Sequence, residues 1–126
     1  MEISLYRIML FGLQIEKLKK FYVDNFDFLV IEETKDEWVV LKAGQFEIAL
    51  HKIRQEFIKV GEHEFWAESN AKLIFRINSD LSIFRQKLIE NGVEVQEIKS
   101  FKGFNSLFCD GVDVEGNVFQ IEQRLD

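Results

Sequence analysis

Few side chains of this 126-residue sequence belong to the types that carry acid–base or nucleophilic chemistry. Of the two histidines, His51 lies in a strand-like run and His63 in an irregular segment, so His51 is the one candidate general base. A structural role is the alternative for His51, and no catalytic residue is assigned. The single cysteine, Cys109, adjoins Asp110 and has no basic neighbour in the sequence to lower its pKa, which favours a buried, inert thiol.

The same sequence offers little for a metal ion. Glu47 and His51 are four residues apart on one predicted strand, a separation of about 13 Å by strand rise, so they cannot share an ion. A single cysteine provides neither an internal disulfide nor a zinc framework. The segment DVEGN (113–117) lacks the ligand spacing of a calcium loop and is predicted to be a turn.

Composition limits the partners. The net charge of −6 opposes a phosphate backbone and the basic residues are scattered, so nucleic acid is excluded as a partner. The apolar runs are too short to span a bilayer and the first residues lack a cleavable signal pattern, so we expect no membrane partner and a cytoplasmic location. The 47% hydrophobic and 30% charged residues are typical of one globular domain, 1–126.

Hydrophobic periodicity predicts an α+β chain in which a strand–helix–three-strand order occurs twice. The first module spans about 4–52 and contains a strand at 4–11, a helix at 15–25 and strands at 28–34, 37–43 and 46–52. A connector follows at 53–70, with one helical turn predicted around Glu56 to Val60. The second module spans about 71–124 and contains a strand at 72–78, a helix at 81–90 and strands at 93–99, 106–110 and 117–123.

Local signals support the second module and its relation to the first. Ser79 or Asp80 can cap the helix at its start, and Asn91-Gly92 ends it as a left-handed cap would. Sliding the chain by 66 residues places Met9 on Phe75 and aligns strand and helix together in one ungapped register. The sequence therefore predicts a repeated unit, with two chance strand–helix units as the alternative.

Three segments carry a resemblance to a known family. They are RIMLFGLQIEKLKKFYVDNFDF (7–28), FRINSDLSIFRQKLIENGVEV (75–95) and DVEGNVFQIE (113–122), in which Val114 stands where proline is usual. Together they resemble the vicinal oxygen chelate superfamily, which includes glyoxalase I, extradiol dioxygenases and the bleomycin resistance proteins. The resemblance implies two βαβββ modules whose curved mixed sheets enclose a cup, with helices on the outer faces, and a homodimer.

In the metal-using members of that family, four strand residues, mostly His and Glu, hold the ion. The resemblance places Arg7 at the first position, and its guanidinium has no lone pair for a metal. Ala49 falls at the second position and has no donor atom, Lys72 or Leu73 at the third, and Gln120 at the fourth. We therefore expect neither a metal nor another cofactor.

Alternation along the strands predicts the side chains that face the cup, because residues two apart share a face. The predicted ligand-binding residues are Arg7, Met9, Phe11, Glu47, Ala49, His51, Lys72, Ile74, Val118, Gln120 and Glu122. The apolar members suit a hydrophobic or planar ligand, and Arg7 suits a carboxylate on that ligand. Alternatively, Arg7 pairs with Glu47 or Glu122 and the cup is closed.

These predictions favour a metal-independent protein that binds a small organic molecule, similar in fold to the bleomycin resistance proteins. One alternative is an enzyme, a lyase, isomerase or dioxygenase relative, that uses a relocated metal or His51 with Arg7. Another is a structural or regulatory homodimer with a filled cup. Three aromatic residues lie around the bend at Gly103: Phe101, Phe104 and Phe108. A flap over the cup, a dimer interface and part of the core are the three alternatives for them.

Overall fold

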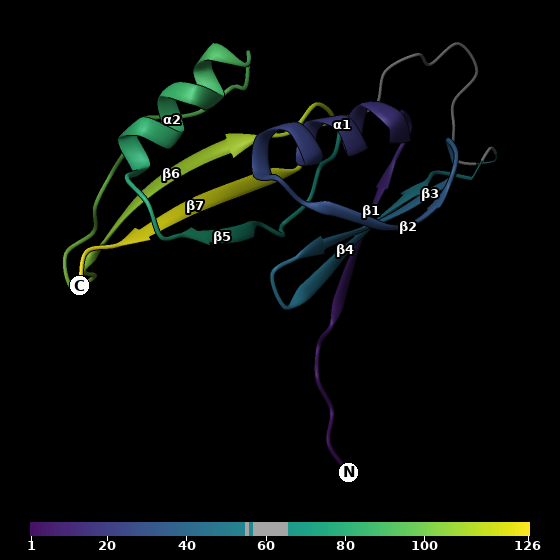
Figure 1. Ribbon diagram of the computed structural model, residues 1–126, viewed down its shortest axis with the longest axis horizontal. Helices are drawn as coiled ribbons and strands as arrows, with labels where there is room; N and C mark the ends of the chain where they lie inside the picture. The colour runs from purple at the N-terminus through teal and green to yellow at the C-terminus, as the bar shows by residue number, and fades with distance from the viewer. Residues whose placement is uncertain (55, 57–65) are drawn as a thin grey trace. The chain divides into compact units, whose positions relative to one another are not determined.

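The computed structural model describes residues 1–54, 56 and 66–126. The chain divides into two compact units, Met1–Phe65 (unit 1) and Trp66–Asp126 (unit 2), and each combines one helix with one mixed sheet (Figure 1). The predicted α+β class is confirmed. Apart from Glu56, the helical turn predicted around 56–60 lies outside the described residues, as does His63.

Unit 1 contains a four-stranded sheet in the order β1-β4-β3-β2. Strand β1 runs parallel to β4, whereas the pairs β2–β3 and β3–β4 are antiparallel. The parallel pairing requires a crossover between β1 and the remaining strands, which the helix and the two hairpins provide. The elements of unit 1 are β1 (Arg7–Gly12), α1 (Ile15–Phe26), β2 (Leu29–Thr34), β3 (Trp38–Ala43) and β4 (Phe46–Lys52).

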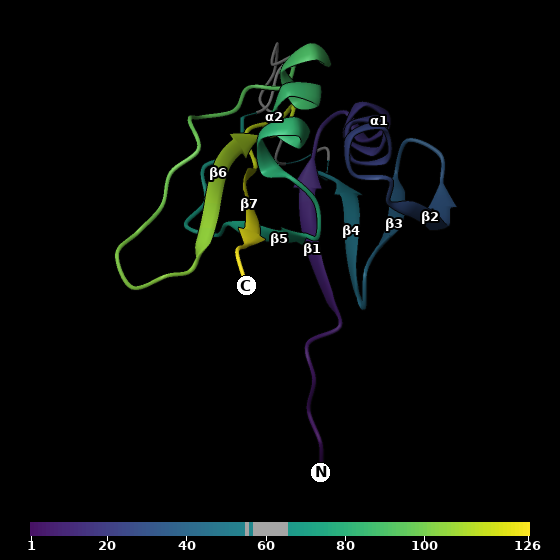
Figure 2. The same cartoon turned by 60° about the vertical axis from the view of Figure 1, so that its left-hand side comes forward.

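Helix α1 covers one face of this sheet (Figures 1 and 2). The ammonium of Lys19 on α1 contacts the Glu33 carboxylate at 2.6 Å, and Glu33 lies opposite Val39 in the β2–β3 pairing. The covered face is therefore the one that carries Val39. Apolar residues from the helix and from this face form the buried core: Ile15, Leu18, Phe21 and Tyr22 with Val39, Leu41, Ile48 and Leu50.

Unit 2 contains a three-stranded sheet in the order β5-β7-β6, with β5 parallel to β7 and β6 antiparallel to it. The Asp80 carboxylate caps the helix by accepting from the backbone N–H groups of Ser82 and Ile83, and the side-chain oxygen of Gln123 accepts from the N–H of Leu81. Since Gln123 is on β7, this bond fixes the start of the helix over the sheet. The elements are β5 (Leu73–Ile77), α2 (Leu81–Glu90), β6 (Ser106–Val112) and β7 (Val118–Arg124).

The strand predicted at 93–99 is wrong: this segment makes only isolated bridges, at Val95 and Lys99, to β6. The backbone at Gln96 shows the cause. Its carbonyl accepts from Arg85 Nε at 2.9 Å and from Cys109 Sγ at 3.3 Å, so side chains occupy a group that a continuous ladder would use. The sheet of unit 2 consequently has one strand fewer than that of unit 1.

The ungapped repeat register is also wrong within the first strands. Met9 lies on the sheet face opposite α1, whereas Phe75 lies opposite Ile121 on the face that α2 covers. The connection from β1 to α1 has two residues and that from β5 to α2 has three. This one-residue difference exchanges the two faces, because side chains alternate along a strand.

The turn between β6 and β7 is held by a buried carboxylate. Asp113 Oδ1 accepts from the backbone N–H groups of Glu115 and Asn117 at 2.8 and 3.0 Å, and Oδ2 accepts from Asn117 Nδ2 at 2.8 Å. Gly116 has a positive φ of 87°, and a Cβ there would lie 2.6 Å from the Trp66 ring. The predicted turn at DVEGN is thus confirmed, with Trp66 packed directly on its glycine.

We predict that Gly116→Ala lowers the free energy of unfolding by more than Gly103→Ala. Gly103 has a similar φ of 91°, but a Cβ added there would have no neighbouring atom within 4 Å, so its substitution measures backbone strain alone. Strain of this kind costs about 1–3 kcal/mol. Gly116→Ala adds displacement of the Trp66 ring. Urea unfolding followed by circular dichroism measures both losses, and equal losses would contradict the packing role of Trp66.

Candidate functional site

Each sheet has one face that its helix does not cover, and we call these the strand faces of units 1 and 2. In unit 1 the pairing registers place Arg7 beside Glu47, Met9 beside Ala49 and Phe11 beside His51. Strand β3 adds Trp38 opposite His51, Val40 opposite Ala49 and Lys42 opposite Glu47. The six predicted residues of the first module therefore share one face.

An ion pair links the first and last strands of unit 1 on this face. Arg7 Nε and Nη2 both donate to Glu47 Oε1, at 3.1 and 2.8 Å. The pair is half-buried, with side-chain exposures of 26% for Arg7 and 21% for Glu47. The pKa of Arg7 is raised above its ordinary value, chiefly by the hydrogen bond to Glu47. The guanidinium is therefore a permanent positive charge whose position the carboxylate fixes.

The same guanidinium reaches across the sheet toward an aromatic side chain. The Arg7 Cζ atom lies 5.7 Å from the centroid of the Trp38 ring and 5.3 Å from that of Tyr6. Ala49 lies midway between Arg7 and Trp38 in the pairing registers, and it is fully buried although its side chain is one methyl group. We conclude that the small side chain at 49 leaves the space in which the arginine and the indole meet.

His51 belongs to an aromatic cluster. Its ring centroid lies 5.7 Å from that of Phe11 and 5.4 Å from that of Trp38. Trp38 Nε1 donates to Glu32, which joins β3 to β2. Among the described residues, no carboxylate contacts the imidazole of His51, so the hydrogen-bonded acid–histidine arrangement of a general base is missing there.

The donors on these faces do not fit a metal of the type that the family resemblance implies. Arg7 donates to Glu47, and Ala49 carries no donor atom. Gln120 uses its amide nitrogen on Asp110 at 2.9 Å. Within residues 1–54, 56 and 66–126, no group of three or more His, Cys, Asp or Glu side chains is close enough together to hold an ion.

The strand face of unit 2 also carries an ion pair between its first and last strands. Arg76 Nε and Nη2 donate to Glu122 Oε1 at 3.1 and 3.0 Å, and Ser106 Oγ donates to Oε2 at 2.8 Å. The hydrogen bond from Ser106 is the main reason that the pKa of Glu122 lies below its ordinary value, with Arg76 contributing in the same direction. Both oxygens of this carboxylate are therefore occupied.

A second carboxylate on this face accepts hydrogen bonds from three side chains. Asp110 Oδ1 accepts from Gln120, and Oδ2 accepts from the ammonium groups of Lys72 at 3.3 Å and Lys99 at 3.1 Å. Burial raises the pKa of Asp110, but hydrogen bonds from Gln120, Lys99 and Lys72 outweigh burial and hold it below its ordinary value. Leu73 pairs with Phe119 on the covered face, so Lys72 is the one of the two alternatives whose side chain reaches the strand face.

The remaining predicted residues differ in how far their side chains are exposed to solvent. Met9, Phe11 and Ile74 are exposed and Val118 is half-buried. Phe108 is buried and its ring lies 5.5 Å from Phe101 and 6.4 Å from Phe104, both of which are exposed. Trp38, Ser106 and Asp110 contact predicted residues but were not themselves predicted. Glu32 and Lys99, which bond to Trp38 and Asp110 in turn, were not predicted either. Alternation along 37–43 was a signal for Trp38, but no local signal marked Glu32, Lys99 or Asp110.

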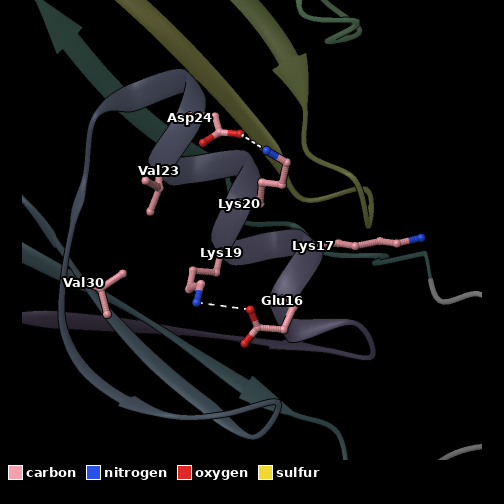
Figure 3. A pocket seen from close by; sticks show the side chains of 7 residues that line it. All are labelled: Glu16, Lys17, Lys19, Lys20, Val23, Asp24 and Val30. Carbon is pink, nitrogen blue, oxygen red and sulfur yellow. Dashed lines mark hydrogen bonds and ion pairs between the residues drawn. The ribbon is translucent and has the colours of Figure 1, made fainter.

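One hollow of about 450 Å³ lies beside α1 in unit 1. Figure 3 shows Val23 and Val30 in its wall, with Lys19 paired to Glu16 and Lys20 paired to Asp24. It lies on the covered side of the sheet, because α1 lines it, and none of the predicted site residues belongs to it. Its charged groups are mostly used in pairs, and Glu16 Oε1 is a buried oxygen of its lining without a hydrogen-bond partner. One such oxygen is not a set of converging polar groups, so the hollow is not the candidate site.

Comparisons with known proteins address the fold. No protein-family model matches the sequence, and no curated protein matches it. A lactoylglutathione lyase from Agrobacterium tumefaciens is similar in structure, with a TM-score of 0.75, 13% identity and coverage of 95% of this chain and 92% of that one. The fosfomycin resistance protein FosX from Listeria monocytogenes has a TM-score of 0.75 at 14% identity, covering 98% and 94%.

An integron cassette protein from the mobile metagenome of V. Pseudocholerae has a TM-score of 0.74 at 22% identity, covering 100% of this chain and 98% of that one. These likenesses confirm that the chain has the glyoxalase-like fold expected from its resemblance to the vicinal oxygen chelate superfamily. At these identities they establish the fold, and function must come from the residues. Among the described residues, no helix is long and apolar enough to cross a membrane.

We predict that Cys109 reacts slowly with a disulfide reagent such as Ellman's reagent in the folded protein. Burial raises the pKa of its thiol, and the side chain is fully buried, so little thiolate is present or accessible at pH 8. Absorbance measures the rate, and unfolding in guanidinium chloride should restore ordinary reactivity. Fast labelling of the folded chain at pH 8 would contradict this view of Cys109 as inert.

Proposed function

We propose that this protein binds a small organic molecule on the strand face of unit 1 and does so without a metal. The observation that carries the proposal is the fixed guanidinium of Arg7 between Glu47 and the Trp38 ring. Exposed Met9 and Phe11 lie on the same face and supply apolar surface beside this charge. A permanent cation next to aromatic and apolar side chains is the combination that holds a planar molecule with an anionic group.

Hydrogen-bond donors on the guanidinium support a carboxylate as that group. Arg7 carries five N–H donors, of which Nε and one on Nη2 are directed at Glu47. The remaining N–H groups can donate to a second carboxylate, for which guanidinium geometry is well suited. Lys42, opposite Glu47 in the pairing, adds a second cation to this end of the face. We therefore propose an aromatic or apolar carboxylic acid as the ligand class.

Two other functions compete with binding. An enzyme that uses His51 with Arg7 is less supported, because no carboxylate of the described residues contacts the imidazole to orient it. A structural homodimer would use the Arg7–Glu47 pair only to satisfy its own charges.

We also propose that the binding protein is cytoplasmic and forms a homodimer. The exposed apolar side chains of Leu5, Tyr6 and Ile8 support the homodimer. Sedimentation equilibrium would test the dimer.

We predict that a thermal-shift screen of aromatic carboxylic acids yields ligands whose effect requires Arg7. At a hundredfold excess over Kd, a ligand stabilises the folded state by about 2.7 kcal/mol, which is visible as a raised unfolding midpoint. Arg7→Ala should abolish the shift. The matched control is Lys17→Ala, which removes an exposed cation of unit 1 that is on α1 and away from the strand face.

The two variants also separate the alternatives. Ligand shifts that survive in Arg7→Ala would place binding elsewhere and contradict the proposed site. An absence of any ligand in a broad library, combined with a large loss of stability in Arg7→Ala, would favour the structural homodimer instead.

We predict that the protein purified without chelators contains metal at well below one equivalent, because no three ligand side chains of the described residues lie close enough together to hold an ion. The double variant Arg7→His with Ala49→Glu supplies two side chains of the family's ligand types and is the positive control for uptake. Inductively coupled plasma mass spectrometry measures both. One equivalent of a transition metal in the unaltered protein would disprove the metal-free proposal.

A further inference from the structure

Two lysine side chains converge on one oxygen on the strand face of unit 2. Lys72 precedes β5 and Lys99 lies in the segment before β6, yet both ammonium groups contact Asp110 Oδ2, at 3.3 and 3.1 Å. The two nitrogens therefore lie within about twice that distance of each other. This spacing is close enough for two oxygens of one small anion to contact both ammonium groups at hydrogen-bond distance.

The local charge balance leaves this pair short of one negative charge. Asp110 has a single charge, and Gln120 already uses its other oxygen. Among the described residues, neither Lys72 nor Lys99 contacts a second carboxylate. Two like charges at this separation repel each other, and one carboxylate offsets only part of that repulsion. A second anion is therefore favoured electrostatically even though the whole chain carries a net charge of −6.

The open side of the pair faces solvent. The side chain of Asp110 is 16% exposed, whereas those of Lys72 and Lys99 are 40% and 44% exposed. Each ammonium has three donors and directs one at Asp110, so donors remain for an incoming group. The centroid of the Phe101 ring lies 5.6 Å from Lys99 Nζ, which is a cation–π contact for that ammonium.

We infer that Lys72 and Lys99 form an oxyanion-binding fork that accepts the carboxylate or phosphate group of a small molecule. Ile74 lies on the same face beside Lys72 in the strand alternation and is exposed, so it offers an apolar contact to the rest of that molecule. This site is in unit 2 and is separate in sequence and residues from the unit 1 face, so the fork does not depend on the binding function proposed there.

The test is a titration of the full ¹⁵N-labelled chain, followed by two-dimensional NMR at constant ionic strength. One arm uses inorganic phosphate and the other uses acetate, because these probes represent the two sources of an oxyanion. We expect saturable shifts at the amides of Lys72, Lys99 and Asp110. Tighter phosphate binding assigns the fork to phosphate-bearing ligands and tighter acetate binding to carboxylates.

Variants decide whether the shifts report the fork. Lys72→Gln and Lys99→Gln should each weaken binding by about tenfold, because each removes a charge-assisted hydrogen bond. Lys99→Arg keeps the charge and should stay within about twofold, which separates loss of the ammonium from loss of folding. Lys17→Gln, an exposed lysine on α1, is the matched control. Non-saturable shifts with both anions, or equal weakening by Lys17→Gln, would overturn the inference.

Discussion

In each unit the first strand pairs in parallel with the last, β1 with β4 and β5 with β7. A parallel pair needs a crossover, and the helix that belongs to that crossover must bury its apolar side on one face of the sheet. The other face then receives every second side chain of each strand. Arg7 and Glu47 are 40 residues apart in sequence, and Arg76 and Glu122 are 46 apart, yet this pairing makes each pair neighbours.

The first strand face shows how one small residue decides the chemistry of its neighbours. With Ala49 between them, Arg7 and Trp38 meet above the sheet. A larger side chain at 49 would occupy that space, so the contact between Arg7 and Trp38 depends on the small residue between them. The face therefore carries a cation whose position is fixed by Glu47 and the Trp38 ring.

Much of the fold could be predicted because it depends on local patterns. Periodicity located both helices and the seven strands of the described residues to within three residues at each end, since apolar spacing and turn residues act over short ranges. The one remaining predicted strand, 93–99, failed because the carbonyl of Gln96 is taken by Arg85 and Cys109, which no local pattern reveals. The repeat register failed for a similar reason, because one extra residue before α2 changes no periodicity within the helix.

In the candidate site, too, the residues that local patterns place were predicted and those that meet through long-range pairing were not. Alternation placed Arg7, Glu47 and His51 on one face correctly, since that needs only the strand period and a parallel register. Which partner Arg7 chooses was open between Glu47 and Glu122, and the structure pairs it with Glu47. Lys99 and Asp110 were not predicted, because they meet Lys72 only through the pairing of β5 with β7 and of β6 with β7.

The ion pairs of the two units look equivalent but are not copies of each other. Ala49 and Gln120 hold equivalent places, opposite Met9 and Ile74 in the parallel registers. Glu47 lies two residues before Ala49, whereas Glu122 lies two residues after Gln120. One pair is therefore displaced toward the start of the parallel strands and the other toward their end. A duplicated ion pair would keep one offset, so the two pairs are separate features on a shared backbone plan.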